Sequence, residues 1–276
     1  MKLFLVWLFT IIITLGAAVY QRISGPTYPK RERIKIDNTE YKLSLVRSHG
    51  GASDAPIELK IDREIEATLF FKNYPVQKDE EWKQVVFTKE QDKYTANLPN
   101  QPAAGKLMYY ISIKSPSGNI DVDKNNPVVL RFKGDVPAWI LIPHVIFMFF
   151  AMFFSNLAGL YAGLKMKYYL RYTYVTLVLL TLGGMILGPI VQYYAFGELW
   201  TGVPYGWDLT DNKTLIGFIF YAVAVLAQLK RNRPYLTIIA AVVVLVIFSI
   251  PHSAFGSELD RSTGTITQGL ILLFGR

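Results

Sequence analysis

The 276-residue sequence contains no cysteine and only three histidines. The lack of cysteine excludes disulfides, thiol nucleophiles, zinc–thiolate sites and cysteine-ligated iron–sulfur clusters, and it leaves the redox compartment open. Charged residues are also scarce, at 18%, while hydrophobic residues reach 51%. Soluble domains carry about 25% charged residues. This composition therefore indicates a membrane protein.

The sequence also lacks the common catalytic signatures. It has no GxSxG, no Walker loop and no dinucleotide-binding fingerprint, so it names no reaction and does not favour an enzyme acting on its own. The net charge is +8. Many of the basic residues flank apolar runs, where Lys and Arg fix the orientation of a membrane protein. Nucleic acid is therefore not an expected partner.

The first apolar run covers residues 3–20, behind Lys2. It fits either a signal peptide cleaved after Ala18 or a retained signal anchor over residues 1–22, and we favour the anchor. Both interpretations place the following domain outside the cytoplasm. The sequence therefore predicts that residues 23–136 are extracytoplasmic.

Residues 23–136 alternate short apolar and polar runs with turn-rich segments, which is typical of an all-β domain. Nine short strands are expected between residues 33 and 132. The run YTANLPNQPAAGKLMYYISI, residues 94–113, resembles the late hairpin of an immunoglobulin-like or fibronectin type III-like domain. That resemblance implies a β-sandwich used for binding or spacing, and it implies no catalysis.

Four further apolar segments follow within residues 137–252, and they predict a four-helix transmembrane bundle. They cover residues 138–164, 172–192, 211–229 and 235–250. The short connections 165–171 and 230–234 are basic and are therefore expected in the cytoplasm. The N-terminus is then cytoplasmic, and the β domain and the 253–276 tail are extracytoplasmic. The predicted location is the inner (plasma) membrane, with several passes.

A structured outer loop is predicted over residues 193–213. Its run FGELWTGVPYGWDLTDNKT combines glycines and carboxylates with Trp200 and Trp207, a composition that favours a packed loop over a flexible linker. Asp208 or Thr210 is expected to cap the helix that begins near Asp211. Lys213 is expected to pair with Asp208 or Glu258. The two Trp side chains belong either to the membrane interface or to a partner-binding loop.

His144 and His252 are predicted at the same outer end of the bundle, with Asp208, Asp211 and Glu258 nearby. These five residues are the candidate metal ligands, and the two histidines are also candidate axial ligands of haem b. Neither histidine has a ligand-spacing motif. Simple interhelical or interfacial hydrogen bonding is therefore the alternative.

Two functional hypotheses follow from these observations. The first is an integral membrane subunit or accessory protein of an envelope complex, which contacts the lipid bilayer and binds other membrane or periplasmic proteins. The second is a membrane redox or metal protein, in which haem b or a transition metal at His144 and His252 serves electron transfer.

Overall fold

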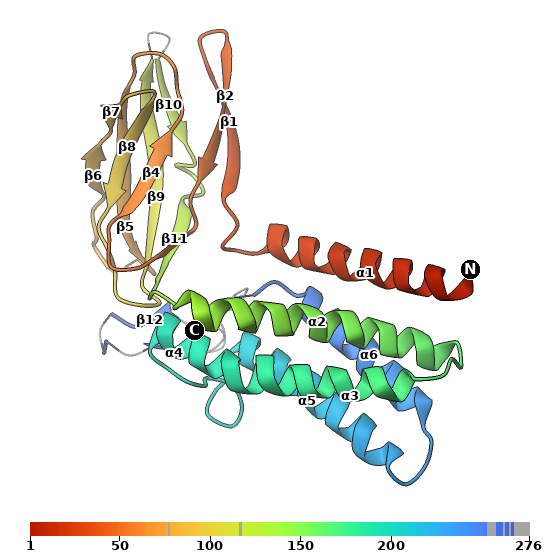
Figure 1. Ribbon diagram of the computed structural model, residues 1–276. Helices are drawn as coiled ribbons and strands as arrows, with labels where there is room; N and C mark the ends of the chain where they lie inside the picture. The colour runs from red at the N-terminus through yellow and green to blue at the C-terminus, as the bar shows by residue number, and fades with distance from the viewer. Residues whose placement is uncertain (77, 116–117, 253–257, 262, 265, 268–276) are drawn as a thin grey trace. The chain divides into compact units, whose positions relative to one another are not determined.

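The computed structural model describes the whole chain except residues 77, 116–117, 253–257, 262, 265 and 268–276 (Figure 1). The chain divides into two compact units. Of the described residues, those within 27–135 and 258–267 form a β unit, and residues 1–26 and 136–252 form a helical unit. The combination of long apolar helices and β-sheets agrees with the mixed membrane fold that the sequence predicts.

The largest sheet of the β unit has six strands. β9 (Lys106–Ser115) pairs antiparallel with β5, β10 and β11, while β3 pairs parallel with β11. The strands of this sheet are β3 (Ser48–Gly50), β5 (Glu66–Tyr74), β6 (Lys83–Val86), β9, β10 (Gly118–Val122) and β11 (Val128–Lys133). The sequence predicts nine strands between residues 33 and 132, and the described residues contain eleven between residues 30 and 133. β3 and β7 (Thr88–Glu90) are three residues long, which is too short for alternation to mark them as separate strands.

Three smaller sheets complete the unit. They are β1 (Lys30–Ile36) with β2 (Thr39–Leu45); β4 (Ala55–Leu59) with β8 (Lys93–Leu98) and β7 (Thr88–Glu90); and β12 (Glu258–Leu259) with β13 (Ile266–Thr267). The first two contribute to the same hydrophobic core as the large sheet.

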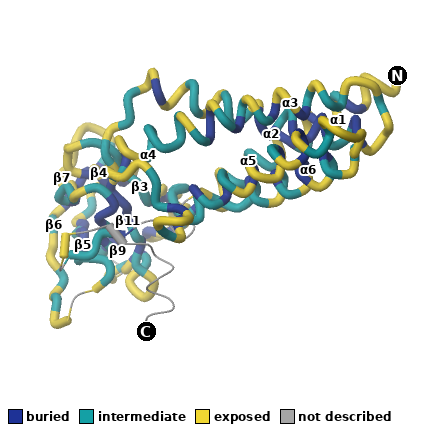
Figure 2. Tube along the Cα trace, turned by 90° about the horizontal axis from the view of Figure 1, so that it is seen from below, coloured by how far each residue is buried: buried dark blue, intermediate teal, exposed yellow. Residues whose placement is uncertain are grey.

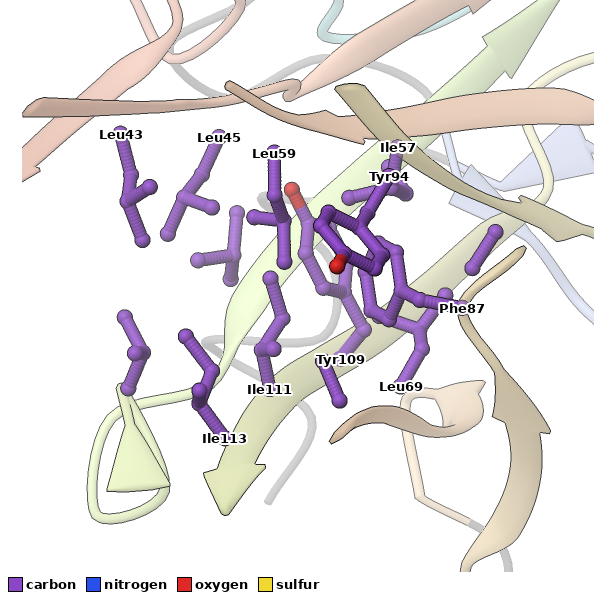
Figure 3. Packing of buried hydrophobic residues seen from close by; sticks show 14 of the residues in the cluster. Leu43, Leu45, Ile57, Leu59, Leu69, Phe87, Tyr94, Tyr109, Ile111 and Ile113 are labelled. Carbon is purple, nitrogen blue, oxygen red and sulfur yellow. The ribbon is translucent and has the colours of Figure 1, made fainter. Parts of the chain in front are cut away.

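Alternate residues of β9 form the centre of that core. Figure 3 shows Tyr109, Ile111 and Ile113 on one side of it and Leu43, Leu45 and Leu59 on the other. Each Leu or Ile buried in this way contributes about 1.5 to 3 kcal/mol. The Tyr109 hydroxyl donates to the Val46 carbonyl at 2.9 Å, which satisfies a polar group that would be costly to bury alone.

The described residues within 258–267 belong to the β unit. Glu258 Oε2 lies 3.2 Å from Lys106 Nζ, the Leu259 N–H donates to the Ala104 carbonyl, and Arg261 donates to the Lys106 carbonyl at 2.9 Å. The sequence predicts a separate tail over 253–276. The described part of that region instead includes a strand pair held to β9.

Within its described residues, the helical unit contains four helices long and apolar enough to cross a membrane: α1 (Lys2–Ser24), α2 (Ala138–Gly163), the continuous Tyr169–Phe196 helix and α5 (Leu209–Gln228). A shorter apolar helix, α6 (Pro234–Ser249), follows. All five occur where the apolar segments predict them. Many of their large apolar side chains are exposed, as expected of surfaces in contact with lipid (Figure 2).

The N-terminal helix packs within this unit. Val6 of α1 forms a small core with Leu157 and Tyr161 of α2. The Asn156 side chain donates to Thr14 Oγ1 at 3.0 Å, and both residues are buried. The sequence predicts an anchor beside a four-helix bundle, whereas α1 is a fifth packed helix. Ser155 also makes an interhelical hydrogen bond, with Tyr221 donating to Ser155 Oγ at 2.7 Å.

The Tyr169–Phe196 helix changes its winding near the middle. It consists of α3 (Tyr169–Leu179), a π-helical stretch η1 (Leu180–Leu187) and α4 (Gly188–Phe196). Pro189 has no N–H to donate, and the Gly188 N–H reaches back five residues to the Gly183 carbonyl. Glycines at 183 and 184 permit close contact with neighbouring helices. A Cβ at Gly184 would lie 2.5 Å from Thr214 Cγ2 of α5.

Candidate functional site

The loop Gly197–Asp208 connects α4 to α5, and Asp208 ends it as the N-cap of α5. Its side chain accepts hydrogen bonds from the Thr210 and Asp211 N–H groups, at 2.8 and 3.3 Å. The Asp208 N–H donates to the Thr201 carbonyl at 3.0 Å. The predicted cap is therefore confirmed, and Asp208 also ties the first turn of α5 to the middle of the loop.

Asp211 and Asn212 hold the loop from inside the helix. Asp211 Oδ2 accepts from the Thr201 N–H at 2.6 Å and from its hydroxyl at 3.2 Å. Asn212 Oδ1 accepts from the Val203 N–H at 2.8 Å. Gly202 must be small here, because a Cβ on it would lie 2.7 Å from Asp211 Cβ. Hydrogen bonds thus hold the loop at Thr201 and Val203, and close packing holds it at Gly202.

The loop that these contacts hold exposes large apolar side chains. The exposed fractions are 56% for Leu199, 82% for Tyr205 and 62% for Trp207, whereas Trp200 is half-buried and donates its indole N–H to the Val203 carbonyl. Trp200 therefore stiffens the loop. Trp207 and Tyr205 present their rings outward.

His144 lies in the second turn of α2, directly after Pro143. Its Nδ1 lies 2.9 Å from the Gly183 carbonyl in η1. A carbonyl oxygen only accepts hydrogen bonds, so the proton is on Nδ1 and the neutral ring keeps a lone pair on Nε2. The sequence predicts neither this partner nor the π-helical winding, although the Gly183-Gly184 and Gly188-Pro189 pairs signal an irregular helix.

Lys213 and His252 lie at the junction of α5 and the end of α6. Lys213 is buried and donates to the Ile250 carbonyl at 2.7 Å. Of its two predicted partners, Asp208 attracts Lys213 electrostatically, while Glu258 pairs with Lys106. His252 is an exposed residue, yet protein surrounds its imidazole closely enough to lower its pKa by desolvation. Lys213 and His144 add to this effect because both lie within electrostatic range of His252.

Glu258, the remaining candidate ligand, is in the β unit and pairs with Lys106. The third histidine, His49, contacts the Ser53 carbonyl at 2.9 Å in that unit. The described residues contain no group of three or more His, Asp or Glu that could hold a metal ion. His144 thus lies within electrostatic range of His252, while the carboxylates of Asp208 and Asp211 stabilise the loop.

Comparison with known proteins identifies no relative, since no family model and no curated protein matches the chain. The function of the protein is therefore inferred from its own residues.

Proposed function

We propose that the protein is an integral membrane subunit or accessory protein of an envelope complex. In this proposal the β unit is an extracytoplasmic immunoglobulin-like sandwich, and it shares partner binding with the Gly197–Asp208 loop. The immunoglobulin-like assignment is supported by one hydrophobic core that receives residues from several antiparallel sheets.

The proposed orientation is supported by the charges at the helix ends. Lys165 and Lys167 lie between α2 and the next helix, and Arg171 lies in the first turn of that helix, while Lys230, Arg231 and Arg233 lie between α5 and α6. At the opposite ends, Glu198 and Asp208 lie in the loop and Asp211 lies in the first turn of α5. Exposed aromatic residues occur near both ends, with Trp139 and Tyr193 at one and Tyr168 and Tyr235 at the other. Basic connections favour the cytoplasm, and aromatic rings favour the two interfaces.

The membership of residues 258–267 in the β unit supports the same topology. Both parts of that unit, 27–135 and 258–267, must lie on one side of a membrane. The chain between them therefore crosses an even number of times. α2, Tyr169–Phe196 and α5 account for three crossings, so α6 makes the fourth, although its 16 residues span only about 24 Å.

The observation that carries partner binding is a rigid loop with exposed aromatic side chains. A loop backbone that is already ordered loses little conformational entropy when a partner binds, and Tyr and Trp are frequent hot spots of protein interfaces. Tyr205 and Trp207 lie on such a backbone, because Asp208, Asp211 and Asn212 hold the loop around them.

Site-specific photocrosslinking in cells tests the proposal. A photoreactive residue at position 205 or 207, in place of Tyr205 or Trp207, is expected to give a discrete protein adduct. The double variant Tyr205→Ser/Trp207→Ser is expected to dissociate from the native complex, so that it no longer migrates with the complex on blue-native gels. Tyr193 is the matched control, since it is an exposed aromatic residue on a helix end. Adducts with lipid alone at positions 205 and 207 would show that the loop is a membrane anchor.

A further inference from the structure

His144 has the arrangement of a metal-binding histidine. Metal-ligating imidazoles almost always donate their other ring N–H to a carboxylate or a backbone carbonyl, which fixes the ring and leaves the second nitrogen as the ligand. His144 does this through Nδ1, at 2.9 Å from the Gly183 carbonyl. That carbonyl also accepts the Gly188 N–H, so the π-helical winding sets its position. Nε2 is then the ring atom available to a ligand.

Met148 supplies a soft donor next to this ring. It lies one helical turn after His144 on α2, and residues four apart share a helix face. Its Sδ lies 3.2 Å from the position a Cβ on Gly183 would take and 3.5 Å from the equivalent position on Gly184. His144 and Met148 thus contact the same glycine pair of η1. The thioether occupies the space that these two residues leave.

A continuous set of contacts brings His252 to the same region. Gly184 of η1 meets Thr214 of α5. Lys213, the residue before Thr214, holds the Ile250 carbonyl at 2.7 Å, and His252 follows two residues later. The end of α6 is therefore fixed beside the helix end that carries His144.

The donor set decides which metal suits the site. The thioether is a soft ligand that selects Cu(I), and imidazole suits copper as well as zinc, whereas Mg²⁺, Ca²⁺ and Mn²⁺ require oxygen ligands. The carboxylates at the start of α5, Asp208 and Asp211, already hold the helix cap and Thr201. The Lys213 ammonium holds the Ile250 carbonyl, two residues before His252, and repels a divalent ion about twice as strongly as a monovalent one. Both features favour Cu(I) over Zn²⁺.

We propose that His144, Met148 and His252 form a Cu(I)-binding site at the end of the helical unit where α2 begins and α6 ends. Nε2 of His144 and Sδ of Met148 are its helix-borne ligands, and His252 completes it from the segment after α6. The site is independent of partner binding by the Gly197–Asp208 loop, because different side chains carry the two functions.

Anaerobic titration of the full-length protein in detergent with Cu(I), in competition with bathocuproine disulfonate, tests this site. We expect one Cu(I) per chain. His144→Asn and Met148→Leu should each weaken affinity roughly tenfold or more, as should His252→Asn. Asn at position 144 keeps an N–H donor for the Gly183 carbonyl while it removes Nε2, so the fold is retained. X-ray absorption should detect a sulfur ligand that Met148→Leu removes.

The matched controls are His49→Asn, in the β unit, and Met152→Leu, one turn further along α2. Both should bind Cu(I) with unchanged affinity. A chain that binds no stoichiometric Cu(I) overturns the proposal, as does an equal loss in the control variants. Affinity retained in His144→Asn with an unchanged melting temperature also overturns it. Displacement of Cu(I) by equimolar Zn²⁺ would show that the metal class is wrong.

Discussion

At the scale of single residues, Asp211 is the side chain on which the loop depends most. Its carboxylate is buried and accepts two hydrogen bonds from Thr201, ten residues earlier. A buried donor that loses its acceptor costs about 1 to 3 kcal/mol. Asp211→Ala should therefore lower the free energy of unfolding by that amount and make the loop a protease target, whereas Glu198→Ala, at an exposed position, should not. Equal proteolysis of the two variants would contradict the structural role of Asp211.

The sequence predicts the helix cap at Asp208 because capping is local: the side chain and the N–H groups it accepts from are within three residues. The Thr201 contact of Asp211 is not predictable in this way, since it depends on how the intervening turn folds. The same holds for His144. Its partner lies 39 residues away, on a stretch whose π-helical winding leaves no trace in hydropathy.

Lys106 gives a prediction about pH. Burial desolvates its ammonium and lowers its pKa below 10.5, although the attraction of Glu258 opposes the shift. Between the lowered pKa and 10.5 the unfolded chain binds more protons than the folded chain at this residue, so its contribution to stability rises with pH. The stability of the wild type relative to Lys106→Met should therefore increase as the pH rises toward 10.5. Parallel pH profiles of the two melting curves would refute this assignment.

At the scale of elements, periodicity predicts the strands and the five apolar helices well, because each has a strong pattern over its own length. It does not predict that α1 packs into the helical unit or that residues 258–267 join the β unit. Both outcomes depend on contacts between segments far apart in sequence, such as Asn156 with Thr14 and Glu258 with Lys106.

The contact between η1 and α5 is the element-scale prediction. A Cβ on Gly184 would lie 2.5 Å from Thr214 Cγ2, so Gly184→Ala should destabilise the helical unit by about 1 to 3 kcal/mol through overpacking. Thr214→Ser removes that methyl group and keeps a hydroxyl for the Thr210 carbonyl. The double variant should therefore recover most of the loss. Gly16→Ala is the control, because nothing lies within 4 Å of its Cβ position. Melting temperatures in detergent provide the measurement, and a double variant no more stable than Gly184→Ala would disprove the contact.

At the scale of the whole molecule, the proposed topology has a consequence that charge alone does not give. Basic connections 165–171 and 230–234 predict which helix ends face the cytoplasm. The 16 residues of α6, however, are fewer than the roughly 20 that a membrane-spanning helix needs, so its length does not show that it crosses. The placement of residues 258–267 in the β unit supplies the missing constraint, since one folded unit cannot lie on both sides of a bilayer.

Single cysteines test this constraint directly, because the natural chain has none to remove. Asn125→Cys and Thr263→Cys lie in the two separate parts of the β unit and are exposed, as are Lys167→Cys and Arg231→Cys between helices. In intact cells an impermeant maleimide should label positions 125 and 263, and it should label 167 and 231 only after the membrane is opened. Labelling of 125 without 263 would show that α6 does not cross, and protection of both would reverse the orientation. Either result would also remove the reason for placing the loop with Tyr205 and Trp207 outside the cytoplasm.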